Sequence, residues 1–146
     1  MTNESLINHL NEQGLTADAG QVAVADYSVS FQVNPRSTLF VVNHPASAVL
    51  LIAPESDYTQ SADQLGVSEE SKIGHSDFDD RYVIRDPEGR AGSVLKPEVI
   101  SAVQALEPFV ELELNSKQYR LLKEGLDEKQ ALETIRALQQ LVKLTS

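Results

Sequence analysis

The sequence predicts an α+β protein, built as a single domain on a mainly antiparallel sheet with about three helices. Two observations carry this prediction: both halves of the chain contain segments in which apolar and polar residues alternate, and three segments show the spacing of an amphipathic helix. With 146 residues and 41% apolar side chains, the chain can form one hydrophobic core. We therefore expect residues 1–146 to form one domain in the order α-β-β-β-loop-β-α-β-β-α.

The first element is expected to be a short helix near the N-terminus. Its apolar residues Leu6, Ile7 and Leu10 follow the spacing of one helical face. Thr2 or Asn3 precedes them and provides an N-cap, since a side-chain oxygen at that position accepts a free backbone N–H.

Three strands joined by short turns are expected next, as an antiparallel meander. Residues 27–33 alternate apolar and polar side chains, residues 38–42 are β-branched or aromatic, and residues 48–53 are apolar. The last of these strands is apolar on both faces, so it is expected to be central or covered by helices.

A change of phase precedes these strands. Val22 and Val24 alternate on the parity opposite to that of residues 27–33. A shift of one residue sends every side chain to the other face of a sheet. The sequence therefore predicts either a bulge near Ala25 or two separate strands.

The segment from about residue 54 to residue 76 is polar and rich in Ser, Asp and Glu. Because most connections in compact domains are about 4–6 residues long, we expect either a flexible excursion or a short helix around residues 61–65.

The second half of the chain predicts a β-α-β-β-α unit. A strand around Tyr82 is followed by a helix that begins at Pro97, and both ends of that helix are marked by proline, with Pro108 as the stop. Residues 110–114 and 119–122 form a hairpin. The final helix is expected to begin with a capping box and to bury one apolar face; its cap residues are Asp127 and Gln130.

The charge is strongly acidic and unevenly placed. The net charge is −10, of which −8 falls on residues 1–71, where Arg36 is the one basic residue against nine acids. Such a surface repels phosphate backbones and anionic headgroups, so neither nucleic acid nor membrane is an expected partner. A basic protein would be attracted, although high negative charge also serves solubility alone. The start of the chain lacks a secretory pattern, which predicts a cytoplasmic location.

Residues 74–81 contain the one dense cluster of candidate ligands and proton carriers. On an extended chain His75, Asp77 and Asp79 share one side and could bind a divalent metal. The alternative is that these aspartates solvate the start of an edge strand. Asp80 and nearby arginines form either an anion-recognition surface or ion pairs between strands; these arginines include Arg81 and Arg85. The sequence has no Cys and no phosphate-binding glycine loop, and no cofactor is expected.

Residues 74–144 resemble bacterial proteins of unknown function. The resemblance rests on Phe78-Asp79 at the opening of a strand, on a Leu-x-Pro helix start at Leu95 and Pro97, and on the hairpin and last helix that follow. It implies an α+β unit without an established activity. The order of elements is also similar to that of type III secretion chaperones, which bind partner polypeptides as dimers.

These observations favour a non-catalytic, cytoplasmic protein-binding or chaperone-like module that forms a homodimer. The alternative is a metal-binding protein or a metal-assisted hydrolase that uses His75, Asp77 and Asp79. A convergent set of catalytic side chains is not visible in the sequence, which favours the binding module.

Overall fold

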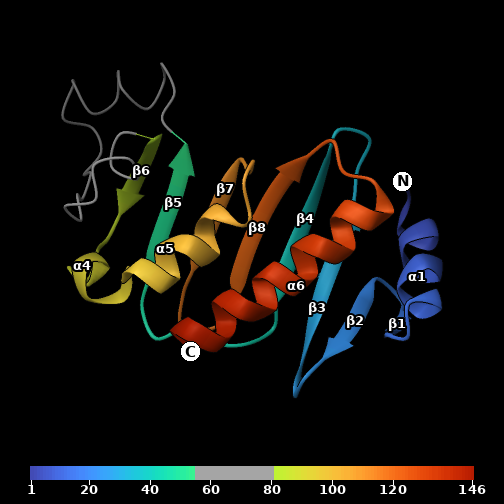
Figure 1. Ribbon diagram of the computed structural model, residues 1–146, viewed down its shortest axis with the longest axis horizontal. Helices are drawn as coiled ribbons and strands as arrows, with labels where there is room; N and C mark the ends of the chain where they lie inside the picture. Colours follow the sequence, from blue (N-terminus) through green and yellow to red (C-terminus); the bar gives the residue numbers. More distant parts are fainter. Residues whose placement is uncertain (55–80) are drawn as a thin grey trace.

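The protein is an α+β domain in which one eight-stranded antiparallel sheet packs against a layer of helices (Figure 1). The computed structural model describes residues 1–54 and 81–146. The expected helix around residues 61–65, and the question of whether residues 54–76 are flexible, fall almost wholly outside these ranges. The predicted fold class is confirmed.

The strands account for most of the alternating segments. Their bounds are β1 Thr16–Asp18, β2 Gln21–Val24, β3 Tyr27–Val33, β4 Ser37–Val42, β5 Leu50–Pro54, β6 Tyr82–Arg85, β7 Glu111–Leu114 and β8 Tyr119–Glu124. Along the sheet they follow the order β1-β2-β3-β4-β8-β7-β5-β6. Every neighbouring pair is antiparallel.

The predicted meander is correct for β3 and β4 and wrong for β5. The β7–β8 hairpin lies between β4 and β5, where β8 forms a six-residue ladder with β4 and β7 pairs with β5. Strand β5 is nevertheless interior, because β6 covers its other edge. Late strands therefore join early ones at the centre of the sheet, and this long-range pairing makes the two halves one domain.

The phase change near Ala25 is resolved as two separate strands. β2 and β3 pair directly, with Val24 opposite Tyr27, and the chain reverses at Ala25, which has a left-handed φ of +46°. A second tight hairpin, between β1 and β2, places both Ala19 and Gly20 at positive φ. The short edge strand β1 was not predicted from the sequence.

The helices are α1 Asn3–Glu12, α4 Ala91–Val94, α5 Pro97–Gln104 and α6 Glu128–Thr145. Both expected caps are present: the hydroxyl of Thr2 accepts the Ser5 backbone N–H, and Asp127 with Gln130 forms a capping box. Helix α5 ends four residues before Pro108, the predicted stop. The short helix α4 was not predicted.

The core lies between the helical layer and one face of the sheet. Alternate strand residues such as Phe40, Ile52 and Leu121 are fully buried there, and they share one cluster with Leu10 of α1 and Leu138 of α6. At about 1.5–3 kcal/mol for each large side chain, this cluster is the main source of stability. Val110, which the sequence pattern places at the start of the hairpin strand, instead precedes β7 and is 40% exposed.

The C-terminal end of α6 is fixed to the sheet by a buried hydrogen-bond chain. The hydroxyl of Thr145 donates to the Leu141 carbonyl, so the phenol of Tyr119 is the donor in its 2.6 Å contact with the Thr145 oxygen. These two hydrogen bonds link α6 to β8. Among the helices of residues 1–54 and 81–146, none combines the length and the apolar composition of a membrane span.

Candidate functional site

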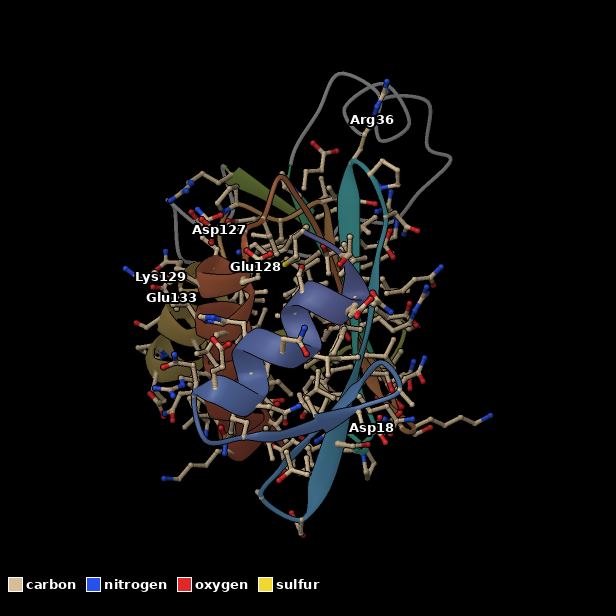
Figure 2. The ribbon with its side chains drawn as sticks, turned by 90° about the vertical axis from the view of Figure 1, so that its right-hand side faces the viewer. Asp18, Arg36, Asp127, Glu128, Lys129 and Glu133 are labelled. Atoms are coloured by element: carbon tan, nitrogen blue, oxygen red, sulfur yellow. The ribbon has the colours of Figure 1, made fainter. Side chains whose placement is uncertain are left out.

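The second face of the sheet differs in character from the core face. In side view the helices lie on one side of the sheet, and no described helix covers the other side (Figure 2). We call this second surface the open face. Its central residues are Leu39 and Val41 of β4, Arg120 and Leu122 of β8, Glu111 and Glu113 of β7, and Leu51 and Ala53 of β5.

Strand register aligns open-face residues into a row that crosses six strands. Val41 is opposite Arg120, Arg120 is opposite Glu113, and Glu113 is opposite Leu51. Ser30 and Arg85 extend the row at its two ends. All of these side chains are half-buried, so each has both protein contacts and an accessible surface.

A second row on the open face is more apolar. Leu39 lies directly opposite Leu122, and Gln32 and Glu111 flank this pair on the neighbouring strands. Both leucines are half-buried and lie outside the core cluster. Opposed residues of an antiparallel pair have Cβ atoms about 4.5–5.5 Å apart, so the two leucines form one continuous apolar patch.

Two charges at the centre of the open face form an ion pair. A guanidinium nitrogen of Arg120 lies 3.7 Å from a carboxylate oxygen of Glu113, and both side chains remain partly exposed. Asn115 also donates to the other carboxylate oxygen of Glu113 at 3.0 Å. An exposed pair of this kind contributes about 0–1 kcal/mol to stability, so it fixes orientation more than it stabilises the fold.

One end of the open face is hollowed. A cavity of about 430 Å³ is bounded by Leu51, Arg85, Pro87 and Glu113, with Val49, Leu50 and Asp86 completing its walls. The carboxylate of Asp86 accepts the backbone N–H of Ala91 at 2.6 Å, which holds the turn after β6 against α4. The hollow thus combines apolar walls with one cation, Arg85, and two anions, Asp86 and Glu113.

The structure separates the predicted site residues. His75, Asp77, Asp79 and Asp80 fall outside the described residues, so the metal site that they would form stays a prediction. Within the described ranges, no three His, Cys, Asp or Glu side chains gather in a way that would hold a metal ion.

The two predicted arginines have different surroundings. Arg81 forms an ion pair with Glu107 and lies 5.8 Å from the ring centre of Tyr82. Burial, together with the Glu107 carboxylate, raises the pKa of the Tyr82 phenol well above its usual value. Arg85 instead lines the hollow of the open face. The ion pair of Arg81 therefore involves the segment after α5 and not a neighbouring strand.

Sequence reasoning missed Leu39, Val41 and Leu122 as site residues. A signal was present, because residues 39–42 are apolar without interruption and so place apolar side chains on both faces of β4. That pattern is the same for a strand buried on both faces and for one with an exposed apolar face.

Comparison with known proteins reveals a likeness of fold. No family model and no curated protein matches the chain. Among solved structures, it is similar to the crystal structure of the mycobacterial trehalose monomycolate transport factor A, TtfA, with a TM-score of 0.57. The match covers 97% of this chain and 93% of that one at 11% identity. At this identity the likeness shows the fold alone.

Proposed function

We propose that this protein is a non-catalytic binding module whose open face binds a segment of another polypeptide. The single observation that carries the proposal is the contrast between the two faces: one is closed by helices, whereas the other presents half-buried leucines among charged side chains. Contiguous apolar surface surrounded by polar groups is typical of protein-binding surfaces.

The chemistry of the open face favours a polypeptide as the ligand. Leu39 and Leu122 provide a flat apolar patch, while the hollow beside Leu51 can accept one side chain of a partner. Small-molecule sites, in contrast, enclose most of the ligand surface in a concave cavity. A surface that spreads over six strands suits an extended contact.

The neighbour TtfA is by its name a transport factor, which accords with a fold used for tasks other than catalysis. The net charge of −10 supports a partner with basic groups around its apolar contact residues. A second copy of the chain as the partner, and a cytoplasmic location, stay predictions beside this proposal.

Purification from the native cell tests the proposal with a matched pair of variants. Leu39→Glu places a charge in the apolar patch, and Ser101→Glu adds the same charge to an exposed position of α5. We expect the wild type and Ser101→Glu to retain a stoichiometric partner, or a second copy by light scattering, and Leu39→Glu to lose it.

Thermal unfolding of both variants verifies that they fold. If Leu39→Glu folds and retains the same partner as the wild type, the open face is not the binding surface. If neither the wild type nor Ser101→Glu retains any partner, the binding function itself is wrong.

A further inference from the structure

A line of basic residues runs along α6, on the helical layer and therefore away from the open face. Lys129, Arg136 and Lys143 are spaced by seven residues and are all exposed. Seven residues make almost two turns, so the three side chains drift by only about 20° per interval and lie on one side of the helix. The acidic chain has twelve basic residues in all. Three of them are therefore concentrated on one side of a single helix.

Two hollows adjoin this line. The first, of about 340 Å³, lies between α1 and α6 and is lined by His9, Lys129 and Arg136. The second, of about 570 Å³, lies between α6 and the β2–β3 turn and is lined by Arg136, Lys143 and His44, among others. Because Arg136 lines both, the hollows form one groove along α6.

The side chains of the groove carry a small net positive charge, whereas those of the whole chain are strongly negative. Its side chains include three cations and two histidines against two acids, Glu133 and Asp26, which gives +1 with neutral histidines while the whole chain carries −10. Figure 2 shows Lys129 and Glu133 together on the outer side of α6. None of the three cations has an ion pair or side-chain hydrogen bond with a described residue.

Uncharged groups in the groove provide further hydrogen-bonding capacity. Gln13 lies at the end of α1, and Gln139 and Gln140 lie between Arg136 and Lys143. The phenol of Tyr27 lines the second hollow, where burial and the Asp26 carboxylate raise its pKa, so it stays protonated and can donate. Amide and phenol groups suit a polypeptide backbone, which offers both donors and acceptors.

We propose that this groove binds an extended acidic segment of a polypeptide, with one carboxylate for each cation. Successive cations are about 10.5 Å apart along the helix axis, from seven residues at 1.5 Å each. A chain in the extended polyproline II conformation advances about 3.1 Å per residue and returns its side chains to the same side every three residues, so every third residue faces the next cation after about 9.3 Å. The ligand is therefore a segment with Asp or Glu at every third position.

A nucleic acid is a poorer fit for the groove. A single strand brings a charge on every nucleotide, and the remaining acidic surface of this protein repels such a polyanion. A peptide with three spaced carboxylates meets the three cations and adds little other charge. The groove lies on the helical layer, so peptide binding there is independent of the binding function proposed for the open face.

Fluorescence anisotropy with labelled peptides tests the groove on the full-length protein. The probe is a peptide of about twelve residues with Glu at every third position, and its control has the same composition with the glutamates adjacent. We expect the spaced peptide to bind at least about threefold more tightly than the control peptide. Its affinity should fall as salt rises from about 50 to 200 mM.

Two charge reversals form the matched pair for this test. Arg136→Glu should lower the affinity for the spaced peptide by roughly fivefold or more, because it replaces an attraction by a repulsion at the centre of the line of cations. Lys117→Glu, in the β7–β8 turn, carries the same charge change and should alter binding less than about twofold.

Several results would overturn the inference. These are equal affinity for the spaced and adjacent peptides, equal weakening by the two charge reversals, or no saturable binding of either peptide. Complete displacement of the peptide by a few millimolar inorganic phosphate would likewise assign the groove to a small anion instead of a polypeptide.

Discussion

The two faces of the sheet are built from the same strands but have different roles. On β8, Leu121 is fully buried under the helices, while its neighbour Leu122 is half-buried on the open face. The same contrast separates Ile52 from Leu51 on β5. One face holds the domain together and the other leaves leucines at the surface, so an apolar residue in this sheet is not by itself evidence of a core.

The largest expected effect comes from truncation at adjacent positions of β8. Leu121→Ala should lower the free energy of unfolding by about 2–5 kcal/mol, because it removes packed atoms and leaves a cavity. Leu122→Ala should cost less than about 1 kcal/mol. Urea denaturation of the two variants measures the difference, and equal losses would mean that the open face is packed as tightly as the core.

The next largest loss of stability is expected from breaking the hydrogen bond between Tyr119 of β8 and Thr145 of α6. Tyr119→Phe removes the donor to the Thr145 oxygen and should cost about 1–1.5 kcal/mol. Tyr27→Phe is the matched control, since that phenol lines the surface groove. Hydrogen exchange should locate the loss of protection in the last turn of α6. An unchanged exchange pattern would argue against the link.

Lys123 lies on the core face of the sheet and is 6% exposed. It is the one charged residue that is buried within the described ranges. Burial lowers its pKa, although the Glu133 carboxylate opposes the shift. The charged form is therefore disfavoured in the folded state, so this residue destabilises the protein below its folded pKa. That penalty is relieved as pH rises from the folded pKa toward the unfolded value of 10.5.

Replacing this lysine tests that assignment. Lys123→Met should raise the free energy of unfolding at pH 7 by about 1 kcal/mol. The advantage of the variant should shrink between pH 7 and pH 10, as measured by urea denaturation at both pH values. Lys117→Met, at an exposed turn, should show neither effect. A constant advantage would mean that the lysine has an ordinary pKa.

The smallest effect is expected for the ion pair of the open face. Glu113→Gln should change the free energy of unfolding by less than about 0.5 kcal/mol, because both partners of Glu113–Arg120 are partly exposed. Denaturation at low and high salt measures it. A loss above about 2 kcal/mol would show that the open face contributes to folding as strongly as the core.

The sequence predicted those elements whose caps and periodicity lie within the element itself and do not depend on long-range contacts. The helix α6 follows from its capping box at Asp127 and its apolar face, and α5 follows from Pro97. The edge strand β1 is different, because Ala17 is its one buried residue and the Asn11 side chain bonds both its N–H and its carbonyl. That contact is tertiary, so no periodicity indicates the strand.

The sequence predicted neither the full order of strands in the sheet nor the residues of the candidate site. The insertion of β8 beside β4 depends on pairing between residues some 80 positions apart, such as Phe40 with Leu121. The dense polar cluster that includes His75 is visible in the sequence because its residue types are those of metal ligands and proton carriers. The open face consists of ordinary residues, and strand register alone brings Leu39 beside Leu122.

Site-specific photo-crosslinking in the native cell measures whether the open face contacts a polypeptide. A photoreactive residue is placed at Leu122 on the open face and, as the control, at Ser101 on α5. We predict one discrete adduct from position 122, whose mass identifies a partner or a second copy, and none from position 101. Adducts of equal yield at both positions, or no adduct at position 122, would mean that the open face is not a polypeptide-binding surface.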